Sequence, residues 1–191
     1  PITLKKILKY FGDEKDSSRI VKNIIREREK SPILSVPQLV EIIKKSKKKN
    51  FKKKINICTQ TFQAIRIFVN KEISELIYGL INATKFLKTG GKLIVISFHS
   101  LEDRIVKFYF NNYSKNQSNV SRYSPYTRSK EILFEDYRNK IIKPKQDEIK
   151  ENTSSRSAKL RFATRSEHNY FFPEDLKKKF ENYLNLEAEH V

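Results

Sequence analysis

The sequence is marked first by what it lacks. Its 191 residues include no methionine, no tryptophan, one cysteine and four glycines. A lone cysteine, Cys58, excludes an internal disulfide and a cysteine-based zinc site, and it suits a reducing cytoplasm. Because no apolar run approaches membrane-spanning length, we expect no membrane association, and we expect no signal peptide. A chain that begins Pro1-Ile2-Thr3 and has no methionine is expected to be a portion of a longer reading frame.

Acidic residues are scarce relative to basic ones. Lys and Arg number 40 against 22 Asp and Glu, which gives a formal net charge of +18 and a pI near 9.9. Such an excess favours a polyanionic partner, because lysine and arginine contacts to phosphates release condensed counterions. A solubilising surface encoded by an AT-rich genome would also explain it. The clustering of the charge favours a nucleic acid.

The densest cluster is KKSKKKNFKKK, residues 44–54. It is too charged to pack, so it is either a solvated linker or an arm that contacts phosphates. The global charge leaves both interpretations open. The lysines of this run that we take as candidates for RNA contact are Lys47, Lys48, Lys52 and Lys53.

Apolar periodicity organises the chain into α/β elements. Basic amphipathic helices are predicted over 3–11, 16–30 and from a cap at Ser35, and two further helices follow Thr59. Gly90-Gly91 then precedes the apolar run Lys92–Phe98, which is typical of a strand buried on both faces of a parallel sheet. Helix, glycine turn, strand and helix in this order predict a doubly wound α/β domain. The remaining predictions are an irregular stretch over 111–155, a strand over 156–165 and a terminal helix after Pro173.

The strand end carries the residues best suited to chemistry. Ser100 and Asp103 match a helix-capping box, which leaves Phe98, His99 and Glu102 to face a cleft beyond the carboxyl end of the strand. A serine activated by His99 is a lesser alternative, because no third orienting group is identifiable. The three histidines have no metal-ligand spacing, so no metal site is predicted.

Polar residues on two further segments suit RNA. Gln63 and Arg66 share a helical face and offer an amide for a base edge and a guanidinium for phosphate. Arg156 and Arg161 add basic charge near the last strand. Exposed helix polarity and charged protection of an edge strand explain the same residues almost as well.

Three segments, TQTFQAIRIFVNKEISEL, LKTGGKLIVISFHSLEDRIVK and SRSAKLR, together resemble the MraW family, the ribosomal RNA small subunit methyltransferases H. Residues 3–165 follow the family's order, including its helical insertion. The resemblance implies an S-adenosylmethionine-dependent enzyme that methylates N4 of a cytidine in 16S rRNA of the small ribosomal subunit. It also implies the C-terminal part of a Rossmann-like class I methyltransferase with an inserted helical substrate-recognition domain.

The sequence departs from the family pattern where the cofactor binds. The family's glycine-rich cofactor loop, the acidic residue for the ribose and the Asp-Leu-Gly strand end have no counterpart here. Asn56-Ile57 and Asn152-Thr153-Ser154 replace its usual His-Pro and Asn-Pro-Arg.

The resemblance implies three segments: an insertion with a basic linker over 1–55, the C-terminal half of the methyltransferase domain over 56–168, and an extension over 169–191. It implies that Phe98, His99 and Glu102 wall the substrate pocket, with Ser100 a candidate on the cofactor side. An RNA-binding module without catalysis and, more remotely, a hydrolase using His99 are the alternatives. The oligomeric state stays open, a homodimer included.

Overall fold

A computed structural model describes residues 1–47, 56–115, 132–135, 137 and 139–189. Helices and one two-stranded sheet make up two compact units, Pro1–Ser74 with Asn182–Val191, and Glu75–Glu181. The mixed helix and strand content agrees with the predicted α/β class. None of the described helices combines the length and apolar character needed to cross a membrane.

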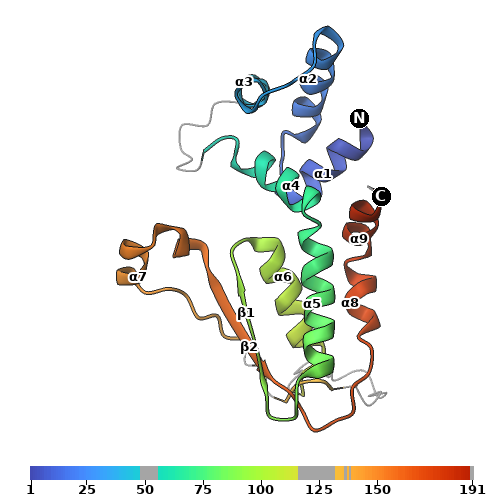
Figure 1. Cartoon of the computed structure of the whole chain (residues 1–191), viewed down its shortest axis with the longest axis vertical. Coiled ribbons are helices and arrows are strands. Elements are labelled where there is room, and N and C mark those ends of the chain that lie inside the picture. Colours follow the sequence, from blue (N-terminus) through green and yellow to red (C-terminus); the bar gives the residue numbers. More distant parts are fainter. Residues whose placement is uncertain (48–55, 116–131, 136, 138, 190–191) are drawn as a thin grey trace, which may run out of the picture. The chain divides into compact units, whose positions relative to one another are not determined.

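The first unit is helical (Figure 1). Its core is formed by the apolar faces of the predicted helices, with Leu8, Ile20 and Ile43 fully buried. The basic residues lie on the opposite, exposed faces, as amphipathic periodicity predicts. The helices of this unit are α1 (Ile2–Gly12), α2 (Ser17–Lys30), α3 (Val36–Ser46), α4 (Thr59–Val69) and α9 (Glu181–Ala188), with the first turn of α5 (Glu72–Phe86).

Gly12 allows α1 and α4 to approach closely. A Cβ at this position would lie 2.4 Å from the backbone oxygen of Gln60 and 2.9 Å from the Cβ of Ala64. Helix α1 ends at Gly12, and the left-handed residue that follows it is Asp13, with φ of 48°. Gly12 is therefore required by packing.

The start of α3 has the predicted cap. Ser35 accepts a hydrogen bond from the backbone N–H of Gln38, and the Gln38 side chain accepts from the N–H of Ser35. This reciprocal pair satisfies two backbone donors that the helix itself leaves without partners. The prediction of a third helix capped by Ser35 is confirmed.

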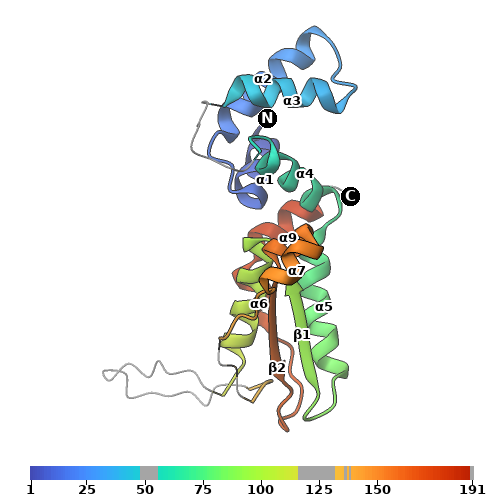
Figure 2. The same ribbon diagram turned by 90° about the vertical axis from the view of Figure 1, so that its left-hand side faces the viewer.

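The second unit is built on an antiparallel strand pair. Strand β1 (Lys92–Ser97) pairs with β2 (Lys159–Thr164), with Val95 opposite Arg161. Helices α5, α6 (Ser100–Asn112) and α8 (Glu174–Lys179) lie on one side of the strands, as the two views in Figures 1 and 2 agree. The short helix α7 (Gln146–Glu151) and a 3₁₀ turn (Thr153–Ser157) precede β2.

The burial of β1 differs from the prediction. Ile94 is 58% exposed and Ile96 is 56% exposed, while Leu93 and Val95, which alternate with them, are half-buried. The expectation of a strand buried on both faces of a parallel sheet is wrong for the described residues. Its only strand partner among them is antiparallel, and an antiparallel pair can leave one face open.

Aromatic side chains form the core of the second unit. Tyr109 and Phe110 of α6 pack edge-on against Phe134, with ring centroids 5.5 Å and 5.2 Å apart. The Tyr109 hydroxyl donates to the hydroxyl of Thr84 in α5 at 2.8 Å. This cluster fixes α6 against α5, and through α6 it fixes the end of β1.

The terminal helix predicted after Pro173 is two short helices, α8 and α9. In the second unit, Phe180 at the end of α8 stacks edge-on against Phe108 of α6. In the first unit, the buried Glu187 carboxylate of α9 accepts hydrogen bonds from the backbone N–H groups of Ile73 and Ser74 at the start of α5. The C-terminal segment is therefore packed into the fold.

Candidate functional site

The end of β1 and the start of α6 hold the candidate site in a second capping box. His99 is the N-cap of α6, and its Nδ1 accepts from the backbone N–H of Glu102 at 3.3 Å. The Glu102 carboxylate accepts from the backbone N–H groups of Phe98 at 2.8 Å and His99 at 3.2 Å. The predicted cap by Ser100 and Asp103 is wrong by one residue. The Asp103 carboxylate instead pairs with Lys159 and Arg161 of β2.

Glu102 is held as an anion. Burial alone would raise its pKa, but hydrogen bonds from His99 and from the Phe98 N–H outweigh burial and lower the pKa. The other imidazole nitrogen, His99 Nε2, is buried and lies 3.2 Å from Glu102 Oε1. Phe98 is 54% exposed. The strand end thus presents an aromatic ring beside a fixed carboxylate.

A buried ion-pair network lies behind this capping box. Asp103 Oδ1 accepts from Arg161 Nε at 2.7 Å, and its Oδ2 accepts from Lys159 Nζ at 3.0 Å. Arg161 also donates to the Tyr137 hydroxyl at 2.6 Å and to Asn139 at 3.0 Å. The network joins the first turn of α6 to β2 and so helps to position the strand end.

Arg161 is consequently unavailable to RNA. The residue is 2% exposed, and its guanidinium is satisfied inside the unit. The proposed contact between Arg161 and rRNA is wrong, because the strand alternation places this residue on the buried face. Arg165 is buried too and donates to carbonyl oxygens of Leu133 and His168. Arg156, in the 3₁₀ turn, is exposed.

Two of the other RNA candidates are engaged within the first unit. The Lys47 amine lies 2.5 Å from Glu14 Oε2, and its side chain is only 6% exposed, so Lys47 is a structural ion pair. Arg66 forms a two-pronged pair with Glu72, at 2.8 Å and 2.9 Å, while half of its side chain stays exposed. Gln63 is half-buried. Lys48, Lys52 and Lys53 lie outside the described residues.

The serine–histidine alternative finds no support in the described part of the chain. The Ser97 hydroxyl donates to the backbone oxygen of Lys159, and His99 Nδ1 is occupied by the Glu102 N–H. Ser100 is the first residue of α6 and makes no hydrogen bond to His99 there. His99 therefore serves as the N-cap of α6, and a nucleophilic serine would need these side chains to be arranged differently.

Sequence reasoning missed the pairing of Asp103 with Arg161. The two residues are 58 positions apart, and no local pattern links them. The one signal was an arginine among apolar residues in the predicted last strand, because a charge on a buried strand face needs a partner.

Comparison with known proteins decides the family. The sequence profile of the MraW methylase family matches residues 2–166. The chain belongs to the MraW methylase family. It is similar to proteins named ribosomal RNA small subunit methyltransferase H, with 39% identity to that of Ruegeria sp. (strain TM1040), 43% to that of Jannaschia sp. (strain CCS1) and 42% to that of Ehrlichia chaffeensis.

These matches cover 87%, 86% and 81% of this chain, but 50%, 50% and 49% of the relatives. The chain thus spans about half the length of the curated MraW relatives it matches. The matched region 2–166 ends before α8 and α9, so this match does not include the two C-terminal helices.

Proposed function

We propose that this chain is the C-terminal portion of a cytoplasmic S-adenosylmethionine-dependent methyltransferase that acts on N4 of a cytidine in 16S rRNA. The observation that carries the proposal is the family match over residues 2–166, with relatives named for methylation of small-subunit rRNA. The net charge of +18 supports an RNA substrate. The division into an insertion over 1–55, a methyltransferase half over 56–168 and an extension over 169–191 belongs to the same proposal.

The open face of the strand pair supports a Rossmann-like sheet that is completed by further chain. Ile94, Ile96 and Phe162 are exposed on one face, and β2 is flanked on its outer side by a bridge from Ile142 to Leu160. The other edge of β1 pairs with no described strand. Since the relatives are twice as long as the match, we assign this edge and face to the half of the methylase fold outside it.

The residues present do not form a cofactor site by themselves. Each of the four glycines is accounted for elsewhere: Gly12 and Gly79 are in helices, and Gly90 and Gly91 turn from α5 into β1. A nucleotide-binding loop instead joins a strand to the helix that follows it. We therefore assign S-adenosylmethionine to the part of the enzyme outside the match and derive no step through it.

The contribution of this chain is to position the base. Cytosine N4 is a poor nucleophile because its lone pair is delocalised into the ring, so orientation and polarisation of the amine are what a protein can supply. The exposed ring of Phe98 offers a stacking surface for an unstacked base. The anionic Glu102 can accept a hydrogen bond from the exocyclic amine, and His99 holds Glu102 in place. Arg66, Gln63, Arg156, Lys48, Lys52 and Lys53 are proposed to contact the RNA.

A fusion tests this proposal. Joining this chain to the part of the Jannaschia relative that lies outside the match should give a protein that incorporates labelled methyl groups from S-adenosylmethionine into small-subunit RNA. A fusion that binds S-adenosylmethionine but leaves the RNA unlabelled would contradict the proposal.

A basic RNA-binding module is the second candidate, favoured by the missing cofactor loop. Methyl transfer by the fusion separates the two, because the part added from the relative is expected to bind S-adenosylmethionine in either case. A module predicts salt-sensitive RNA binding that is indifferent to the cofactor and to Glu102. The enzyme predicts that cofactor binding and methyl transfer occur together.

A further inference from the structure

We propose that a groove in the first unit binds a single-stranded segment of the RNA substrate, with one base stacked on Tyr10 and lysines contacting the flanking phosphates. The groove has a volume of about 620 Å³, within the usual range of small-molecule and nucleotide sites. Lys5, Lys9 and Tyr10 of α1, Lys15 of the following turn, and Tyr183 of α9 line it. That the ligand is RNA rests on the proposed function.

The lysines of the groove are free to meet an anion. Lys5 and Lys9 are one helical turn apart on α1, and Lys15 follows in the turn before α2; all three are exposed. Within the described part of the chain, none of the three forms an ion pair. The charge of the neighbouring Glu14 is matched by Lys47, so Asp13 is the remaining acid that lines the groove. The local charge is positive.

An aromatic wall stands beside these lysines. The rings of Tyr10 and Tyr183 meet edge to face, with centroids 5.9 Å apart. Tyr183 also contacts Phe11 at 5.8 Å, and Phe11 in turn packs near Phe68. The pair is thus anchored to the core, while Tyr10 stays 38% exposed. Rigid aromatic rings next to lysines are what proteins use to hold single-stranded nucleic acid.

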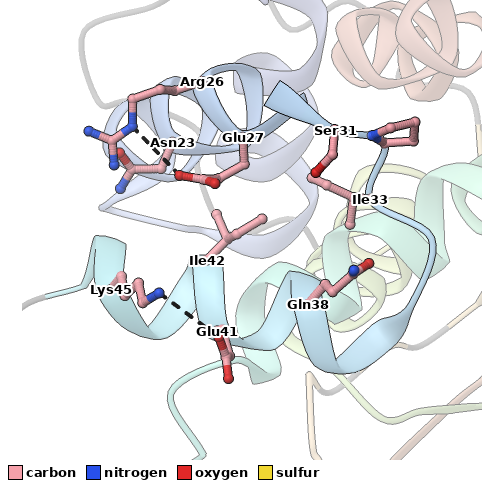
Figure 3. Close-up of a pocket in the computed structure, with 10 residues that line it drawn as sticks. Asn23, Arg26, Glu27, Ser31, Ile33, Gln38, Glu41, Ile42 and Lys45 are labelled. Atoms are coloured by element: carbon pink, nitrogen blue, oxygen red, sulfur yellow. Dashed lines mark ion pairs between the residues drawn. The ribbon is translucent and has the colours of Figure 1, made fainter. Parts of the chain in front are cut away.

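A second pocket in this unit lacks these features. It lies between α2 and α3, as Figure 3 shows, and its volume is about 160 Å³. Its cations are paired within their own helices, Arg26 with Glu27 at 3.8 Å and Lys45 with Glu41 at 3.9 Å. None of the described residues that line it is aromatic. It therefore offers little attraction for a phosphate and no surface for stacking.

The chemistry of the groove selects single strands. In an A-form duplex the bases stay stacked on one another, so only an unpaired nucleotide can present a face to Tyr10. An acidic peptide would satisfy the lysines but would leave the aromatic wall without a planar partner. Tyr183 lies beyond the family match, which ends at residue 166. The proposal therefore gives α9 a role in substrate binding.

Charge-matched variants of the 191-residue chain test the lysines. We would measure by fluorescence anisotropy the binding of a labelled single-stranded RNA of about 12 nucleotides. The double substitution Lys5→Ala/Lys9→Ala is compared with Lys6→Ala/Lys22→Ala, which removes the same charge from exposed positions outside the groove. Each lost phosphate contact should lower the slope of log affinity against log salt by about 0.7. We expect a decrease of about 1.4 for the groove pair and a smaller change for the control.

Tyr10 tests the stacking. Tyr10→Leu should weaken single-strand binding about tenfold and leave duplex binding unchanged, whereas Tyr10→Phe should retain binding. Circular dichroism checks that each variant is folded. Equal effects of the two lysine pairs, no effect of Tyr10→Leu, or competition by polyglutamate as strong as by unlabelled RNA would each overturn the proposal.

The groove and the proposed function can fail separately. Loss of single-strand binding in the groove variants, together with a fusion that methylates no RNA, would leave the groove intact and refute the methyltransferase assignment. Methylation that proceeds while the groove variants bind RNA like their controls would refute the groove alone.

Discussion

Glu102 and Asp103 are neighbours in the chain but serve different purposes. The Glu102 carboxylate closes the capping box of α6 and stays next to the exposed Phe98. Asp103, one residue on, turns into the unit and is neutralised by Arg161 and Lys159. The division follows from helix geometry, because consecutive residues point about 100° apart. The Glu102 carboxylate stays partly exposed at the end of β1, and the Asp103 carboxylate stabilises the fold.

Replacement of Asp103 should destabilise the protein. Asp103→Asn leaves the buried Arg161 guanidinium without its counter-charge, and we expect a loss of about 3 kcal/mol in the free energy of unfolding, measured by urea denaturation. Arg161→Lys serves as a comparison, because it keeps the charge but not the two-pronged geometry.

The same pair predicts a pH dependence. Burial opposes the charged form of Asp103, but the hydrogen bonds from Arg161 and Lys159 prevail and lower its pKa below the ordinary value of 3.8. Its contribution to stability is therefore complete above that value and is lost as the pH falls through the lower pKa of the folded state. Below pH about 4, the free energy of unfolding should fall more steeply with decreasing pH for the wild type than for Asp103→Asn. The same pH dependence in both proteins would contradict the ion pair.

Glu102 allows its cap and its proposed catalytic role to be separated. Gln38 occupies the same place in the capping box of α3, so Glu102→Gln should retain the cap with little change in stability. The substitution removes the anion, and we expect methyl transfer by the fusion to fall at least tenfold. Glu102→Ala should lose both the cap and the activity. Full activity of a folded Glu102→Gln fusion would show that the carboxylate is structural only.

At the scale of helices and strands, the sequence predicted those features that depend only on neighbouring residues in the chain. The helix capped by Ser35 followed from a serine placed just before a helical period of apolar residues, and the last strand followed from alternation of apolar and polar residues. The cap at His99 was missed because histidine is not among the favoured N-cap residues. The directions of the Arg161 and Ile94 side chains were missed because each depends on residues distant in the sequence.

Two glycines provide a matched pair of substitutions. Gly12→Ala places a Cβ 2.4 Å from the backbone oxygen of Gln60, and forcing α1 and α4 apart should cost about 1–3 kcal/mol. Gly79→Ala, in α5, meets nothing within 4 Å and should stabilise the protein by about 0.5–1 kcal/mol. Thermal unfolding of both variants checks the prediction. A midpoint for Gly12→Ala at or above that of the wild type would show that α1 and α4 do not pack as described.

At the scale of the whole molecule, the chain combines a strongly basic composition with an incompletely covered sheet. The charge of +18 is consistent with RNA as partner, and the exposed Ile94 and Ile96 are consistent with further chain packing on β1. The family could be predicted from the SFHSLEDRIVK string, and the profile match confirmed it. The groove at Tyr10 could not be predicted, because it needs Tyr183 to return from the C-terminal helix to α1.

The position of the transferred methyl group tests the account most directly. Small-subunit RNA treated with the fusion and S-adenosylmethionine would be digested to nucleosides and analysed by mass spectrometry. The account predicts N4-methylcytidine at a single site, and its loss in the Glu102→Gln variant. A methyl group on another base or another atom, or none from a fusion that binds the cofactor, would contradict it.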